Sequence, residues 1–391
     1  MSYTAITNSD IKTMLKFINI DNIDNLFDVV PAKYLIDFEK FNIPSSLSES
    51  EVLDKLSKIG ELNSASINKN YIGGGAYDHY IPTIIDFLSS RSEFYTAYTP
   101  YQPEVSQGTL QYLYEFQSMI CELSGMDIAN ASLYDGASAV AEACNLSISY
   151  NRKRKILLSS TLNPNYIEVV KAYFSYNNTK IDYIDDKNGI TDLQDIEKHL
   201  DEEVSCIVIQ SPNYNGIIED WSKFSDLKNK FPDLLIIAVS DPISLSILKP
   251  PGKSNCDIYV GEGQTLGNHL SFGGPYLGLF AAKEKYSRKM PGRIIGRTDD
   301  IDGKEGFVMT LQTREQHIRR ERATSNICTN QGLMALRATI YLSLLGKQGL
   351  PGVAKICFNN TQYACEKIST LKNYSLAYDN KSFIKEFIIK T

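Results

Sequence analysis

Short apolar runs alternate with amphipathic segments along the middle of the chain. Six short runs, most of them largely apolar, have the pattern of buried strands. They are Ile156–Ser160, Lys180–Asp185, Cys206–Gln210, Leu234–Ser240, Asp257–Gly263 and Tyr276–Ala282. Helical segments lie between them, such as TDLQDIEKHL, where Thr191 and Gln194 have the spacing of a capping box. Alternating strands and helices predict an α/β fold, with a mostly parallel sheet covered by helices on both faces.

Residues 1–62 follow a helical pattern and are predicted to form a separate N-terminal arm. Asp10 is placed to cap a first helix. The apolar positions of that helix recur at helical spacing and are Ile11, Met14, Leu15 and Ile18. A second helix is expected in SESEVLDKLSKIGEL, where Ser48 and Glu51 match a capping box. The apolar residues between the two helices suit docking, either on a partner or on the chain's own body.

A large domain is predicted over residues 63–330, and its main body opens at the glycines Gly73–Gly75. One of its helices is expected to bury Leu110, Leu113, Phe116, Ile120 and Leu123. Residues 331–391 are predicted to hold an interdomain helix, Gln331–Leu345, and the start of a small C-terminal α/β domain. The last run, FIKEFIIK, has the pattern of a strand. The small domain looks incomplete, which would leave the edge at Phe383–Ile389 without a strand partner.

Composition narrows the class of protein. A chain of 391 residues with 43% hydrophobic and 22% charged residues is typical of a globular protein that buries a large core. The net charge of −6 argues against a nucleic-acid binder. Four histidines without metal-ligand spacing make a zinc site unexpected. No apolar stretch approaches the ~20 residues of a membrane helix, and no signal peptide is recognisable. Seven scattered cysteines without a CxxC pair favour a reducing compartment, so we expect a cytoplasmic protein.

Three segments are predicted to meet at one edge of the sheet. In parallel sheets, ligands bind beyond the carboxyl ends of the strands. Asp135–Ser138 opens a helix whose N-terminus is able to hold an anion. Asp241 directly follows one expected strand, and Gly261–Thr265 follows the next. The glycine-rich FGGPYLG (Phe272–Gly278) lacks the GxGxxG pattern of a dinucleotide site and is interpreted as a close-approach turn.

The segment Ser90–Gly108, SRSEFYTAYTPYQPEVSQG, is a second candidate site. Pro100 and Pro103 exclude one continuous helix or a central strand. Its tyrosines combine apolar area with a hydroxyl group at low entropic cost, which suits a binding edge. The alternative is a structural loop that covers part of the core.

This loop and four further blocks resemble a known family. The other blocks are GGGAYDHYIP (Gly73–Pro82), ELSGMDIANASLYDGASAVAEA (Glu122–Ala143), VGEGQTLGNHLSFGGPYLG (Val260–Gly278) and TLQTREQHIRRERATSNICTNQ (Thr310–Gln331). They are similar to the pyridoxal-phosphate (PLP) glycine decarboxylases, the P-proteins of the glycine cleavage system, and specifically to the alpha subunit of the two-subunit form. The resemblance implies fold type I of PLP-dependent transferases, with an aspartate-aminotransferase-like large domain.

The resemblance also implies a cofactor site, and one essential residue of that site is absent. PLP enzymes hold the cofactor through a lysine Schiff base, which an amide cannot form. At the family's lysine position this chain has Gln264. Asp241 matches the acidic partner of the pyridinium nitrogen, and Asp135, Gly136 and Ser138 match the phosphate cradle. Three nearby lysines are interpreted as surface residues, namely Lys249, Lys253 and Lys283. We expect a vestigial site in this chain, with PLP bound by a partner beta subunit.

By the same resemblance, the chain is expected to act in a complex of two alpha and two beta subunits. That complex decarboxylates glycine and passes the aminomethyl group to the lipoyl arm of the H-protein, and it serves the T- and L-proteins indirectly. The loop would reach the shared active site through Arg91, Glu93, Tyr95, Tyr98, Tyr101, Gln102 and Glu104. Within it, Arg91 is a candidate for holding a carboxylate in a bidentate pair.

Two basic segments and one histidine have competing interpretations. Arg314, His317, Arg319 and Arg320 are expected to bind an anion or the partner subunit. The alternative is a solvated helix face with an ion pair between Glu315 and Arg319. A second stretch, Lys285, Arg288, Lys289, Arg293 and Arg297, suits an acidic carrier surface or is solvated. His79 is either an acid–base group or a packed, hydrogen-bonded residue.

Two other functions stay open at this point. The first is an autonomous PLP-dependent decarboxylase or aminotransferase that uses another lysine. The second is a non-catalytic interaction subunit that contributes no group to an active site.

Overall fold

The computed structural model describes residues 5–36, 40–64 and 73–391. The chain divides into two compact units, residues 1–71 and 72–391. In the first unit the helices are α1 (Asn8–Phe17), η1 (Ile23–Phe27), η2 (Ala32–Tyr34) and α2 (Glu49–Glu61), where η denotes a 3₁₀ helix. None of the described side chains in this unit is buried. Both docking alternatives for the arm therefore stay predictions.

Capping decides where these helices begin. Ser48 and Glu51 form the predicted capping box of α2, since each side chain bonds the other residue's backbone amide. The predicted cap of α1 is wrong, because the N-cap is Thr7 and Asp10 is the third helical residue of the box. The Thr7 hydroxyl accepts the amide of Asp10 while the Asp10 carboxylate accepts the amide of Thr7, so the pair satisfies two amides instead of one.

The second unit is built on a seven-stranded sheet in the order β1-β9-β8-β7-β6-β2-β3. Its strands are β1 (Ile128–Ala129), β2 (Lys155–Ser159), β3 (Lys180–Ile184), β6 (Val204–Gln210), β7 (Leu235–Val239), β8 (Ile258–Glu262) and β9 (Gly278–Ala282). Neighbours from β3 to β8 are parallel, whereas β9 runs antiparallel to both β8 and β1. The six predicted strands are confirmed to within two residues at each end, and so is the α/β class.

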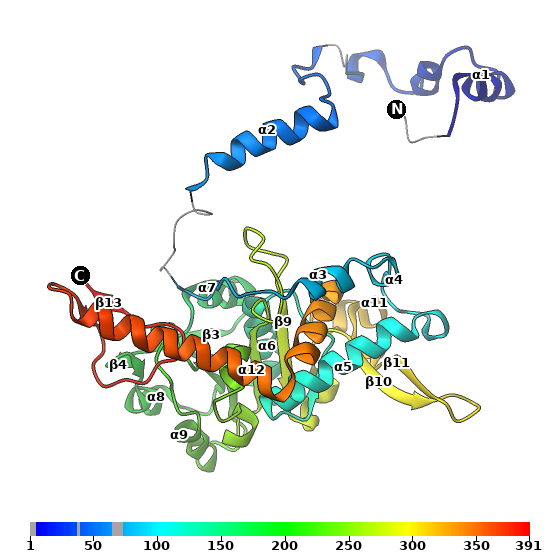
Figure 1. Ribbon diagram of the computed structural model, residues 1–391. Helices are drawn as coiled ribbons and strands as arrows, with labels where there is room; N and C mark the ends of the chain where they lie inside the picture. Colours follow the sequence, from blue (N-terminus) through cyan, green and yellow to red (C-terminus); the bar gives the residue numbers. More distant parts are fainter. Residues whose placement is uncertain (1–4, 37–39, 65–72) are drawn as a thin grey trace. The chain divides into compact units, whose positions relative to one another are not determined.

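Helices cover both faces of this sheet (Figure 1). Side chains alternate between the two faces, so that Ile207 and Ile209 of β6 join one core cluster while Cys206 and Val208 join the other. The first cluster contains residues of α5 (Gln107–Ser124) and α12 (Gly332–Ser369), and the second contains residues of α6 (Gly136–Asn151) and α7 (Pro164–Phe174). The predicted positions of α5 lie in or against the first cluster.

Smaller elements connect and border these layers. The helices are α3 (Thr83–Ser89), α4 (Ser92–Tyr95), η5 (Pro103–Val105), α8 (Leu193–His199), α9 (Ser222–Ser225), η6 (Asp226–Asn229), α10 (Pro242–Leu245), η7 (Pro251–Ser254), η8 (Glu284–Lys289), η9 (Gln312–Arg314), α11 (Gln316–Arg319) and η10 (Arg320–Arg322). The strand pairs are β4 (Asp186–Lys187) with β5 (Ile190–Thr191), β10 (Ile294–Asp299) with β11 (Glu305–Thr310), and β12 (Ser375–Leu376) with β13 (Ile389–Lys390). The predicted cap of α8 at Thr191 is wrong, since Thr191 ends β5 and Asp192 is the N-cap.

The C-terminal segment differs from the expected free strand. The predicted helix from Gln331 reaches the non-helical Gly346, whose φ of 56° is accessible to glycine, and a second helical part of α12 continues to Ser369. Phe383 and Ile384 are buried, and Phe383 forms an antiparallel bridge with Ile217. The expectation of an unpartnered edge at Phe383–Ile389 is therefore wrong, because this segment packs onto the large domain.

Candidate active site

The N-terminus of α6 is the predicted phosphate cradle, and its amides already have carboxylate partners. Asp135 is the N-cap, and its Oδ1 accepts the amide of Ser138 at 2.7 Å. The amide of Gly136 donates to Glu262 Oε2 at 2.9 Å. A phosphate bound here would need these donors. Two side chains of the chain itself therefore take the place of an external anion.

Glu262, at the end of β8, connects the predicted site segments through hydrogen bonds to their backbone amides. Its Oε1 accepts the amides of Gln264 and Leu277, each at 3.0 Å. Burial raises the pKa of Glu262 to about 7, against the backbone hydrogen bonds that favour its charged form. Glu262 was not among the predicted site residues. Its position inside GEGQTLG was the only signal in the sequence, and it does not show whether the carboxylate is buried and hydrogen-bonded or exposed.

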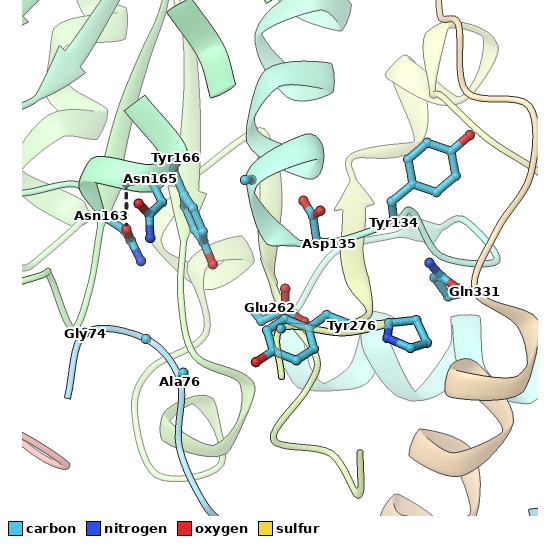
Figure 2. Close-up of a pocket in the computed structure, with 14 residues that line it drawn as sticks. Gly74, Ala76, Tyr134, Asp135, Asn163, Asn165, Tyr166, Glu262, Tyr276 and Gln331 are labelled. Carbon is cyan, nitrogen blue, oxygen red and sulfur yellow. Dashed lines mark hydrogen bonds between the residues drawn. The ribbon is translucent and has the colours of Figure 1, made fainter. Parts of the chain in front are cut away.

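Asp135 and Glu262 lie in a pocket of about 300 Å³. Figure 2 shows their carboxylates close together, with Tyr166 and Tyr276 beside them. Gly74 and Ala76 border the same pocket, so the glycine-rich start of the second unit contributes to it. Among the described residues that line the pocket, none is a cation. The pocket is therefore an unfavourable environment for a phosphate dianion.

Gln264 lies where the resemblance placed the missing lysine. Its side chain is buried, and Nε2 donates to the carbonyl oxygen of Asn268 at 2.7 Å. Its Oε1 is also buried and has no hydrogen-bond partner among the described residues. The side-chain amide of Gln264 thus bonds to the segment that follows it, and an amide nitrogen is not a nucleophile.

Asp241 is the predicted partner of a pyridinium nitrogen, and it binds a lysine instead. Lys385 Nζ lies 2.8 Å from Asp241 Oδ1, and only 7% of the Lys385 side chain is exposed. Asp241 Oδ2 caps α10 through the amide of Ser244 at 2.9 Å. Burial opposes its charge, but Lys385 and these hydrogen bonds hold the pKa of Asp241 below its usual value. Sequence reasoning missed Lys385, because 144 residues separate the pair.

The residues around Lys385 complete this contact. Lys385 Nζ lies 3.1 Å from His79 Nε2 and 4.5 Å from the centre of the Tyr77 ring. Burial, and then the charge of Lys385, lower the pKa of His79 to about 4, so its ring is neutral and accepts a hydrogen bond from the lysine. Next to Lys385, Glu386 accepts the hydroxyl of Tyr77 and the amide of Gly74. His79 is thus the packed, hydrogen-bonded residue of the two interpretations.

These observations test whether the site fits PLP. The cofactor brings a phosphate anion, a ring nitrogen that needs an acidic partner, and an aldehyde that needs a lysine. In this chain Asp135 and Glu262 accept the amides, Lys385 pairs with Asp241, and Gln264, where the resemblance leads us to expect the lysine, bonds to the Asn268 carbonyl. The residues present do not fit PLP.

The other lysines do not enter this site. Lys249 and Lys253 are exposed, as predicted. Lys283 is half-buried, and its Nζ donates to Asn255 Oδ1 at 2.7 Å. Within residues 5–36, 40–64 and 73–391, no group of His, Cys, Asp or Glu side chains is arranged to hold a metal ion.

The aromatic loop is exposed and irregular. Arg91 pairs with Glu93 at 2.5 Å, and both side chains are about half exposed. Tyr95 and Tyr98 are 68% and 88% exposed. A hollow of about 580 Å³ is lined by loop residues that include Glu93, Tyr98, Tyr101 and Gln102, while Glu104 is exposed nearby. The loop offers aromatic area to a second molecule, which is what a binding edge requires.

The segment 312–322 lies against this loop through Tyr101. The Tyr101 ring is 6.0 Å from the His317 ring and 5.8 Å from the Arg293 guanidinium. Arg314 donates to the carbonyls of Leu311, Met290 and Gly292, so it also holds the local backbone.

The alternative solvated helix is not formed at this segment. Helix α11 has only four residues, and Arg319 and Arg320 at its end are exposed. The ion pair expected between Glu315 and Arg319 is absent from the described residues. Glu315 is buried, and the basic side chain paired with it is that of His317, at 3.7 Å.

Comparisons with known proteins agree with this architecture. The model of the glycine cleavage system P-protein family matches residues 1–391. The "Probable glycine dehydrogenase (decarboxylating) subunit 1" of Desulforamulus reducens is 48% identical over all of this chain and 87% of that protein. A crystal structure of glycine decarboxylase (P-protein), in inhibitor-bound form, superimposes with a TM-score of 0.92 at 39% identity, over all of this chain and 87% of that chain.

A more distant structure shows the fold alone. The glutamate decarboxylase of Lactobacillus brevis has a TM-score of 0.64 at 12% identity, over 89% of this chain and 79% of that one. These matches agree with the sheet order, with the helices on both faces of the sheet and with the resemblance that five sequence blocks indicated. The chain belongs to the glycine cleavage system P-protein family and has the fold of type I PLP-dependent enzymes.

Proposed function

We propose that this chain is the alpha subunit of a heteromeric glycine decarboxylase whose PLP is held by a homologous beta subunit. The observation that carries the proposal is the pairing of Asp241 with Lys385, together with the burial of Gln264. The charged groups of this site are paired with groups of the same chain, so they are not available to bind a cofactor. The family's reaction requires PLP, and we therefore assign PLP to the second subunit. The name "subunit 1" of the relatives agrees with a second subunit.

In the complex, glycine is decarboxylated on PLP and the aminomethyl group passes to the lipoyl arm of the H-protein. This chain contributes its exposed loop to the shared active site, with Arg91 binding a carboxylate and Tyr95, Tyr98 and Tyr101 lining the path of the lipoyl arm. Gln102, Glu93 and Glu104 add polar contacts. Arg319 and Arg320 contribute to the subunit contact with His317. Support comes from the exposure of these side chains and from the contact of Tyr101 with His317.

The assembly we infer contains two alpha and two beta chains and works with the T- and L-proteins through the H-protein. We infer a cytoplasmic location, because all seven cysteines have free thiols, as in a reducing compartment. None of the helices in the described part of the chain is long and apolar enough to cross a membrane.

The experiment is glycine–bicarbonate carboxyl exchange with the chain alone, the beta subunit alone and the mixture. We expect exchange only in the mixture, and a colourless alpha chain after incubation with PLP. The Gln264→Lys variant of the alpha chain is also expected to stay colourless, because Glu262 and Lys385 still occupy the site. Exchange by the alpha chain alone would overturn the proposal.

One observation supports the autonomous PLP enzyme as a second candidate. Lys385 is an amine inside the candidate site, and Nζ lies within hydrogen-bond distance of Asp241. If Lys385 carried PLP, borohydride reduction of the isolated chain would attach PLP to the peptide that contains it. Reduction without attachment excludes this candidate.

Variants of the Ser90–Gly108 loop distinguish the non-catalytic interaction subunit from the proposed function. It predicts that loop variants bind the beta subunit and support full exchange. Loss of exchange with retained binding favours the shared site instead.

A further inference from the structure

A cavity of about 310 Å³ lies at the C-terminal end of α6 and is surrounded by cations. Seven basic side chains line it, and no carboxylate does. They are Arg152, Arg154, Arg288, Lys289, Arg314, Arg319 and Arg322. The sequence pattern indicated two separate basic stretches. The fold joins parts of both and adds two arginines that follow α6.

These charges come from three segments that are distant in the sequence. Arg152 and Arg154 stand between α6 and β2, Arg288 and Lys289 end η8, and the others lie between residues 314 and 322. Solvated surface charges normally spread apart, because like charges repel. Cations that gather in one concave site therefore favour a ligand that neutralises them.

Few of these cations have a partner within the protein. Five of the side chains have no hydrogen bond or ion pair among the described residues, namely Arg152, Arg154, Arg288, Lys289 and Arg319. Arg322 has only a 3.8 Å contact with the exposed Glu321. Arg314 donates to three carbonyl groups, and the only charge compensation it has among the described residues comes from the neighbouring Glu315.

The nearest buried acids do not neutralise the cavity. Glu315 does not line the cavity, and its charge acts on Arg314, which is one of seven cations there. Burial raises the pKa of Glu142 to about 7, so much of its charge is suppressed at neutral pH. Burial, followed by the charges of Arg152 and Arg319, lowers the pKa of Lys289. The lowered pKa of Lys289 agrees with an excess of positive charge.

The remaining lining residues suit an oxyanion. Asn145, Ser149 and Thr324 contribute polar groups, and Ile148 and Ala323 are the apolar residues. Asn145 Nδ2 donates to the Thr324 carbonyl at 2.5 Å, which connects α6 with the segment after η10. Arginine forks bind phosphate oxygens in pairs, so several of them around a small cavity match a multivalent phosphate.

The cavity is distinct from the candidate active site. That site contacts the N-terminus of α6, whereas this cavity lies where the helix ends, and 16 helical residues span roughly 24 Å. We propose that it binds a compact anion with two or more phosphate groups. A small concave site favours such an anion over the broad surface of an acidic protein. This inference does not depend on the proposed function.

The test is calorimetric titration of the full chain with inorganic pyrophosphate at two salt concentrations. We expect saturable binding with one site per chain, weakened by added salt. The variant Arg152→Gln/Arg288→Gln is expected to weaken binding tenfold or more, since it removes two charges from different walls. The matched control is Arg297→Gln/Lys304→Gln, which removes two charges from the exposed β10–β11 hairpin. It should bind like the wild type.

Two results would overturn the proposal. The first is equal weakening by the cavity and hairpin variants, which would indicate general electrostatic attraction. The second is the lack of saturable pyrophosphate binding at the lower salt concentration. If the Arg152→Gln/Arg288→Gln chain then also associates more weakly with the beta subunit, the cavity is a protein contact. Thermal unfolding of each variant checks that loss of binding does not reflect loss of folding.

Discussion

Lys385 Nζ lies 2.8 Å from Asp241 Oδ1, and the two residues are 144 positions apart in the chain. The ammonium thus pairs with the residue that the family resemblance assigns to a cofactor nitrogen. The C-terminal segment and the large domain are thereby joined by a largely buried ion pair.

Removing one partner of this pair is expected to destabilise the fold. Lys385→Met should lower the free energy of unfolding by about 3–5 kcal/mol, because Asp241 would be left as an uncompensated charge. Combining it with Asp241→Asn should recover part of the loss. Urea denaturation measures both. The control Lys390→Met removes an exposed lysine from the end of the same segment, and its effect should stay within about 0.5 kcal/mol.

Glu262 is expected to make stability depend on pH. Its folded pKa, about 7, is above its unfolded value, so its contribution is fully present below the unfolded pKa and is lost as pH rises through 7. Between pH 5 and pH 8 the wild type should lose about 2–3 kcal/mol of unfolding free energy relative to Glu262→Gln. Urea denaturation at the two pH values tests this. The exposed Glu305→Gln control should follow the wild type.

Arg91 is expected to matter for activity and not for folding. Its pair with Glu93 is exposed, so Arg91→Ala should leave the midpoint of urea denaturation unchanged. Exchange by the assembled complex should fall about tenfold or more, because a hydrogen bond between two charged groups is lost. Arg297→Ala, which breaks the comparable exposed pair with Glu305, is the control. Full activity of Arg91→Ala would remove Arg91 from the proposed site.

Gln117 holds the β10–β11 hairpin against α5. Its side-chain amide donates to the carbonyl of Ile295 and accepts the amide of Ile295, each at 2.9 Å. Gln117→Leu should cost about 2–4 kcal/mol, because two buried backbone groups lose their partners. Gln111→Leu on the exposed side of the same helix should cost less than about 0.5 kcal/mol. Equal costs in urea denaturation would contradict this account.

Local patterns in the sequence were enough to predict most elements. Runs such as Cys206–Gln210 predicted their strands because burial on both sheet faces demands continuous apolar residues. Ser48 and Glu51 predicted a helix start because the capping box is local. Each of these inferences depends on neighbours within a few residues.

What fills the site depends instead on packing between distant segments. The sequence pattern places Lys385 in a final strand and Glu262 near the end of another, and neither residue has a local pattern that indicates its partner. Their partners, Asp241 and the amide of Gly136, lie 144 and 126 residues away. Hydrogen bonds and ion pairs act over a few ångströms of space and leave no periodic trace in the chain. The partners of Asp241 and of the Gly136 amide could therefore be identified only from the tertiary structure, in which the sheet and the C-terminal segment pack together.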